Sequence, residues 1–100
     1  MMNCRFHPAV DLDYLEAYGW YENRSFRAAR GFEVAVQAAL IEACTNSLHY
    51  AVFNRLQFRR CPLSRYPISL VYLVEPDHIF VVSIDHSKRD QHWKGRRTDF

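Results

Sequence analysis

The chain has 100 residues, of which 49% are hydrophobic and 15% aromatic, and its formal net charge is +2. This length and apolar content predict one domain over residues 1–100 and exclude a disordered chain. No apolar run approaches the ~20 residues that cross a bilayer, and the polar start lacks the apolar stretch of a signal peptide. We therefore expect a cytoplasmic protein with no membrane contact.

The first elements expected are a short strand over Asn3–Phe6 and a helix over Asp11–Asn23, with Asp11 as the N-cap. One broad side of this helix is apolar and mostly aromatic: Tyr14, Leu15, Ala17, Tyr18 and Tyr21. The other side is polar and also carries a tryptophan: Asp13, Glu16, Asn23 and Trp20. Trp20 is therefore a candidate for contact with a partner.

A second helix is expected over Phe26–Thr45. Its apolar residues recur at helical spacing and form one core-facing stripe: Ala29, Phe32, Val36, Ala39, Leu40 and Ala43. Gly31 is a weakness inside the helix that costs ~1 kcal/mol relative to alanine. Because the turn between the two helices is short, we expect an antiparallel hairpin.

From Leu56 onward the apolar pattern changes to a period of two, which predicts strands in "LQFRRC", "PISLVYLVE" and "HIFVVSID". The "EPDH" between the last two favours a hairpin turn. The order strand–helix–helix–strand–strand–strand predicts an α+β fold, with the helical hairpin packed on one face of a small, mainly antiparallel sheet. A short C-terminal helical turn is expected last.

Positive charge is concentrated in the second half of the chain, in residues 55–65 and 86–97. In the expected sheet, the loop after the second strand and the end of the fourth strand lie close together. We expect a cluster there that binds a phosphate or a carboxylate: Arg59, Arg60, Arg65, His86 and Arg89. The alternative is a set of solvated arginines that keep the sheet edge from pairing with other chains.

His86 ends a strand beside several cations. It is the candidate base if the chain is a nuclease, and the alternative is a histidine that caps the strand by a hydrogen bond. Beyond it, Trp93 is expected to cover the open end of the core, with base stacking as the alternative. Arg96 belongs to a basic tail available to an acidic partner.

Cys4, Cys44 and Cys61 are odd in number and widely spaced, so they predict no disulfide framework, in keeping with the cytosol. No two cysteines, and no cysteine–histidine pair, have the spacing of a zinc site. With only three glycines, a loop that cradles a nucleotide is also disfavoured. We expect neither a metal nor a cofactor.

Two long stretches resemble the RelE/ParE superfamily of toxins from bacterial type II toxin–antitoxin systems. They are "DLDYLEAYGWYENRS…AARGFEVAV" and "RRCPLSRYPISLVYLVEPDHIFVVSIDHSKRDQHWKGR". The most specific parts are "WYE", "RR…L…RYPI…VY" and the terminal H-x-x-R-x-x-x-W. The resemblance covers nearly the whole chain, is strongest to the ParE, plasmid-stabilisation branch, and implies the fold derived above.

The resemblance also implies a partner and a target. The partner is a cognate antitoxin with an acidic C-terminal segment, and operator DNA would be bound only through it. In the ParE branch the target is DNA gyrase, and its members lack the residue set of the ribonucleases. In the RelE branch the chain is a metal-independent ribonuclease on ribosome-bound mRNA. That reading places Arg59 or Arg60, Arg65 and Arg89 on the phosphate and His86 as the base. A third reading is an inactive co-repressor.

Overall fold

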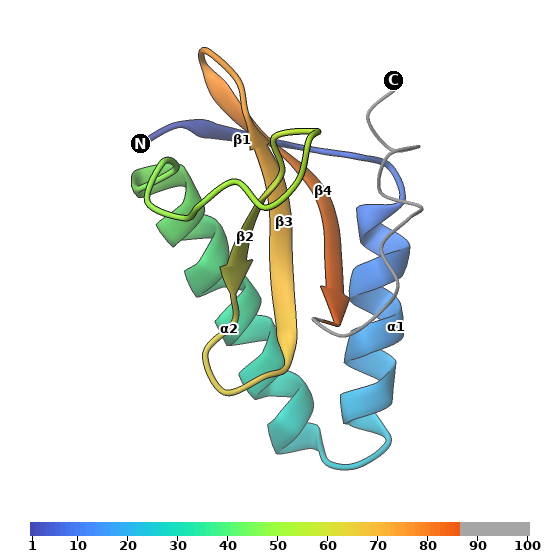
Figure 1. Ribbon diagram of the computed structural model, residues 1–100. Helices are drawn as coiled ribbons and strands as arrows, with labels where there is room; N and C mark the ends of the chain where they lie inside the picture. Colours follow the sequence, from blue (N-terminus) through green and yellow to red (C-terminus); the bar gives the residue numbers. More distant parts are fainter. Residues whose placement is uncertain (87–100) are drawn as a thin grey trace.

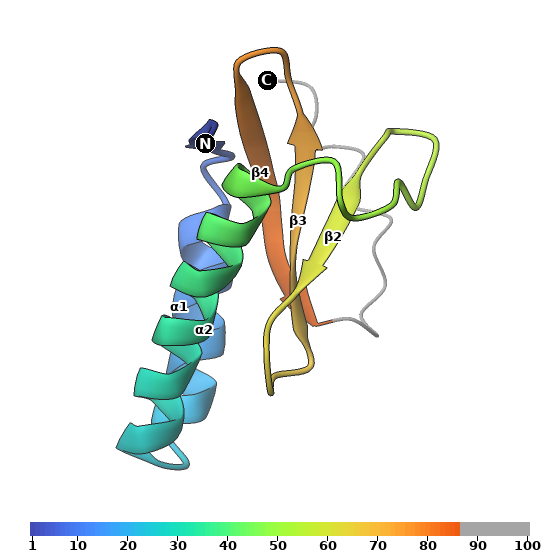
Figure 2. The same ribbon diagram turned by 90° about the vertical axis from the view of Figure 1, so that its left-hand side faces the viewer.

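The computed structural model describes residues 1–86, which form two layers (Figures 1 and 2). In chain order the elements are β1 (Asn3–Phe6), α1 (Val10–Glu22), α2 (Phe26–Thr45), β2 (Arg59–Pro62), β3 (Ile68–Val74) and β4 (His78–His86). The strands lie in the order β1-β4-β3-β2, with β1 parallel to β4 and the other pairs antiparallel. The predicted α+β fold is therefore confirmed. Arg89, Trp93, Arg96 and the expected C-terminal turn lie outside the described residues.

The helical hairpin covers one face of the sheet, as Figure 2 shows in side view. α2 begins where the Ser25 hydroxyl accepts a hydrogen bond from the Ala28 amide at 2.9 Å, an N-cap that was not predicted from the sequence. Five residues of the predicted stripe are buried and the sixth, Leu40, is partly buried. The predicted core face of α2 is confirmed.

α1 packs beside α2 through aromatic rings. The rings of Tyr14 and Tyr21 stack on Phe32, with centroid distances of 5.5 and 5.4 Å. The helix begins one residue before Asp11, and no side chain caps it. Leu15, which was predicted on the apolar side, is 62% exposed, so that prediction is wrong.

The sheet has apolar residues on both faces. On β3, alternate residues from Ile68 through Tyr72 face the helices, and Val71 packs on the opposite face with Phe58 and Val82. This confirms the predicted alternation of β3 and the inner position of β4. β2 is shorter than predicted, because Leu56 lies in an exposed turn before it.

Cys4 and Cys44 form a disulfide between β1 and the end of α2, with their Cα atoms 6.8 Å apart. The prediction that the chain has no disulfide framework is therefore wrong for this pair. A separation of 40 residues conceals the contact in the sequence, since only the packing of β1 beside the last turn of α2 creates it. Cys61 is a buried free thiol.

Within residues 1–86, no helix is long and apolar enough to cross a membrane.

Candidate functional site

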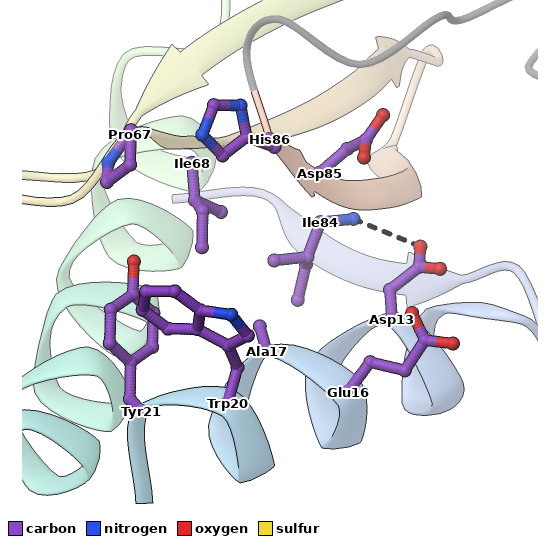
Figure 3. Close-up of a pocket in the computed structure, with 10 residues that line it drawn as sticks. All are labelled: Asp13, Glu16, Ala17, Trp20, Tyr21, Pro67, Ile68, Ile84, Asp85 and His86. Carbon is purple, nitrogen blue, oxygen red and sulfur yellow. Dashed lines mark hydrogen bonds between the residues drawn. The ribbon is translucent and has the colours of Figure 1, made fainter. Parts of the chain in front are cut away.

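A pocket of about 400 Å³ lies between α1 and the ends of β3 and β4 (Figure 3). Its lining residues come from α1, from the residue before β3 and from both strands: Asp13, Glu16, Ala17, Trp20, Tyr21, Pro67, Ile68, Ile84, Asp85 and His86. Two residues named from the sequence, Trp20 and His86, thus lie in one pocket although 66 positions separate them along the chain.

Polarity is segregated along the pocket. Figure 3 shows the rings of Trp20, Tyr21 and Pro67 at one end and the carboxylates of Asp13 and Glu16 at the other. Between the two ends lie aliphatic side chains: Ala17, Ile68 and Ile84. Such a pocket suits a ligand group that is apolar along its length and charged at its tip.

The position of Asp13, at the acidic end of the pocket, depends on the short length of β1. β1 pairs with β4 only as far as Val81, and the bond from the His7 amide to the Val81 carbonyl closes that ladder at 2.9 Å. The next part of this edge of β4 faces α1, where the Ile84 amide donates to Asp13 Oδ2 at 3.2 Å. Asp13 thereby satisfies a donor of the sheet edge and is held at the pocket.

Contacts with Arg24 and Tyr21, on the same helix or just after it, hold the Trp20 side chain in position. The Arg24 guanidinium lies 3.2 Å from the centroid of the Trp20 ring and donates to the Trp20 carbonyl at 2.9 Å. Tyr21 meets the same ring edge to face, with centroids 4.9 Å apart. Although these contacts position the indole, Trp20 remains 52% exposed and lines the pocket.

Tyr21 also lines the aromatic end of the pocket, and its hydroxyl is neutral. Burial, followed by the neighbouring Tyr66 hydroxyl, raises its pKa above the usual value of 10.0. The phenol therefore stays protonated at neutral pH.

His86 ends β4 opposite Ile68, which is consistent with the predicted closeness of the third–fourth hairpin at this end. The cations that follow it in the sequence, Lys88 and Arg89, lie outside the described residues. Asp85 precedes it, and among residues 1–86 the charged groups that share its pocket are carboxylates, with no lysine or arginine. The nearby acids arrive from α1, which sequence order does not place beside β4.

The structure separates the predicted basic cluster. Arg59 is paired with Tyr72, far along β3 from His86, and its Nη1 donates to the Tyr50 carbonyl at 2.6 Å. Arg60 is on the opposite face of the sheet, with its guanidinium 4.2 Å from the centroid of the Phe53 ring. The prediction that both converge with His86 is therefore wrong, because adjacent strand residues point to opposite faces.

Arg65 lies in the exposed β2–β3 loop with a φ of 71°, a left-handed conformation uncommon outside glycine. The loop joins β3 at the end of the strand that lies opposite His86. Of the basic residues named from the sequence and described by the structure, Arg65 is thus at the expected end of the sheet.

Three acidic pocket residues were not chosen from the sequence as site residues: Asp13, Glu16 and Asp85. For the first two a sequence indication existed, since they share the polar side of α1 with Trp20. Asp85 follows an apolar run, and its 3% exposure is a result of tertiary packing. In residues 1–86, no group of three histidine, cysteine, aspartate or glutamate side chains could hold a metal ion.

The architecture is that of a two-layer α+β domain with a helical hairpin on a four-stranded sheet. No model of a known protein family matches the chain. No curated protein matches it either. Among solved structures, it is similar to a chain described as "Chromosomal ParDE TA system from P. aeruginosa", with a TM-score of 0.64 and 19% sequence identity. The match covers 86% of this chain and 96% of that chain, and shows a shared fold.

Proposed function

We propose that the chain is the toxin of a type II toxin–antitoxin system. It would inhibit growth in the cytoplasm by binding a cellular target, with DNA gyrase favoured, and a cognate antitoxin would neutralise it. The observation that carries the proposal is the fold shared with a chain of the ParDE system over 96% of that chain. The sequence resemblance to the ParE branch, stated above, points the same way.

The geometry of the site favours action by binding over catalysis. Arg59 is engaged with a backbone carbonyl, and Arg60 lies on the other face of the sheet, so neither joins His86 in a phosphate clamp. His86 instead shares its pocket with Asp13 and Glu16. Carboxylates would repel an RNA phosphate, whereas a pocket with aromatic walls suits a protein partner.

The alternative function is a metal-independent endoribonuclease on ribosome-bound mRNA. One observation favours it: Arg60 lies in β2 of the sheet, and the RelE resemblance implies cations on the sheet. In that case His86 would be the base, and its loss would lower the cleavage rate by ~10²–10⁴. Arg65 and Arg89 would complete the phosphate contacts.

The test begins with induction of the chain without a partner while growth is followed. Purified protein is then assayed for cleavage of translated mRNA and for inhibition of gyrase supercoiling. Blocked supercoiling with intact mRNA supports the gyrase proposal, and the reverse outcome supports the nuclease. Full growth counts against both. Because disulfides are rare in the reducing cytosol, the assays use protein with the Cys4–Cys44 disulfide formed and reduced.

A His86→Ala variant separates the two functions further. We expect it to remain toxic, because binding of a protein target needs no proton transfer from the imidazole. His49→Ala is a matched control, since His49 is exposed and lies outside the pocket. Loss of toxicity in a folded His86→Ala variant, with His49→Ala still toxic, would overturn the preference for gyrase.

The proposed antitoxin has an acidic C-terminal segment for the basic parts of the chain. A short acidic reading frame beside the coding sequence would identify it, and co-expression should restore growth. Binding to operator DNA is then expected from the complex and not from this chain alone.

A further inference from the structure

We propose that the pocket between α1 and the sheet binds one arginine or lysine side chain inserted by a separate polypeptide. The inference rests on the proposed function, in which the chain works by contact with other proteins. The proposal gives the partner one cationic anchor residue, although the net charge of +2 on this chain alone favours an acidic partner.

The first argument is the match between the pocket and a long cationic side chain. Arginine and lysine have an apolar stem and a charged head, and they bury the stem where the head can reach polar groups. In Figure 3 the stem would pass Trp20, Ile68 and Ile84 and place the head at Asp13 and Glu16. An aliphatic or acidic side chain would fill one end of the pocket and leave the other end mismatched.

The second argument is charge. Every charged residue of α1 is acidic, so Val10–Glu22 contributes four negative charges: Asp11, Asp13, Glu16 and Glu22. Asp13 and Glu16 lie three residues apart and face the same end of the pocket, an arrangement of like charges that destabilises a helix. Within residues 1–86, Glu16 forms no hydrogen bond or ion pair. A bound cation would supply Glu16 with a partner.

The third argument is the aromatic wall. A guanidinium or ammonium group is attracted to the face of an indole ring. Trp20 already holds the guanidinium of Arg24 at 3.2 Å, so the ring accepts a cation in this protein. Half of the residue stays exposed, and it lines the pocket.

β4 does not supply the cation for the acidic end of the pocket. Ile84 lies beside Asp13, and β4 continues for two more residues to His86 (Figure 3). At His86 the strand has therefore already passed the acidic end. β4 itself carries no lysine or arginine, so we assign the cation to a separate chain.

The test uses two blocked peptides, acetyl-Ala-Arg-Ala-amide and the same peptide with citrulline, which keeps the shape and removes the charge. Binding to the ¹⁵N-labelled full chain is followed by NMR at the Trp20 indole and the Ile84 amide, and a Trp93→Phe variant assigns the two indole signals. We expect the arginine peptide to shift both signals and to bind about 10-fold more tightly than the citrulline peptide. Equal binding of the two peptides overturns the proposal.

Substitutions of acidic residues on α1 test whether the peptide binds in this pocket. Glu16→Gln should weaken binding of the arginine peptide about 5-fold, because it removes a charge-assisted contact without disturbing the fold. Glu22→Gln is the matched control, since Glu22 is an exposed acid of the same helix outside the pocket, and it should change the affinity less than about twofold. Equal effects of the two variants would mean that the peptide senses only the general charge of α1, which also overturns the proposal.

A further experiment tests whether Lys88 or Arg89 of the same chain occupies the pocket. The double variant Lys88→Gln/Arg89→Gln should bind the arginine peptide as the wild type does. A severalfold rise in affinity would mean that these residues compete for the site and would overturn the assignment to a separate chain. Arginine-selective binding by a non-toxic chain would refute the proposed function alone. Toxicity without such binding would refute the pocket assignment alone.

Discussion

Gly31 lies inside α2 where an alanine would normally be preferred, and the structure predicts the opposite outcome for that substitution. A Cβ at position 31 would collide with the Tyr66 hydroxyl. That hydroxyl donates to the Ala28 carbonyl at 2.9 Å. The Tyr66 ring is held edge to face by Tyr21 and Phe32, with centroids 4.9 and 5.8 Å away, so it cannot move aside without losing these contacts.

The magnitude follows from the opposing terms. Helix propensity alone would make Gly31→Ala stabilising by ~1 kcal/mol. Displacing the Tyr66 hydroxyl costs its hydrogen bond, ~1 kcal/mol, and overpacking adds ~1–3 kcal/mol. We therefore expect Gly31→Ala to destabilise the chain by about 1–3 kcal/mol. Tyr66→Phe alone should cost ~1 kcal/mol.

The double variant Gly31→Ala/Tyr66→Phe isolates the collision. Without the hydroxyl, the nearest ring carbon is 3.6 Å from the new Cβ, an ordinary contact, and the helix propensity of alanine is recovered. Adding Gly31→Ala to Tyr66→Phe should thus be neutral or stabilising, which gives a coupling energy of ~2 kcal/mol between the two positions. Urea unfolding of the four proteins measures it. A coupling below ~0.5 kcal/mol would refute the explanation, because distant sites add within that margin.

Three further predictions concern the rest of the fold. Reducing the Cys4–Cys44 disulfide, which spans 40 residues, should lower the free energy of unfolding by about 4 kcal/mol in urea titrations. An equal effect of reductant on a Cys4→Ser variant would contradict it. Burial raises the pKa of Tyr72 from 10.0 to about 12, so its contribution to stability is complete below pH 10.0 and is lost as the pH rises through about 12. Tyr72→Phe should therefore flatten the alkaline loss of stability over that window, and an unchanged loss would exclude Tyr72 as its source. Arg59→Ala should cost ~1–3 kcal/mol through its lost bond to the part-buried Tyr50 carbonyl, whereas Arg55→Ala, in an exposed turn, should change stability by less than ~0.5 kcal/mol. Equal costs in thermal unfolding would contradict this.

The elements of the fold were predictable because their periods are strong. The stripe of α2 from Ala29 to Ala43 repeats for four turns, and the alternation in β3 is unbroken over Ile68–Val74. The α2 pattern reflects burial on one face of the helix, whereas β3 is buried on both faces and its alternate residues belong to two different cores. The start of β2 was misplaced because Leu56 extends the alternation by chance, whereas the chain turns there with Gln57 at a φ of 68°.

The pocket was only half predictable for a related reason. Its α1 wall was visible as the polar side that holds Asp13, Glu16 and Trp20, but such a side is ordinarily read as solvated. What makes it a pocket is the end of β4, and that contact arises because β1 stops pairing at Val81 and leaves the next part of the edge to α1. The length of a neighbouring strand cannot be read from the helix.

The number of charges in a stretch of sequence does not tell which of them share a site, and two pairs of residues illustrate this. Arg59 and Arg60 are adjacent in sequence, and the period of a strand sends them to opposite faces of the sheet. Asp13 and Glu16 are three residues apart, and the period of a helix brings them to one end of one pocket. Whether charges act together therefore depends on the period of the element that carries them. On this reasoning a Glu16 variant should alter partner binding more than an Arg59 variant, provided that both proteins are compared at equal folded concentration.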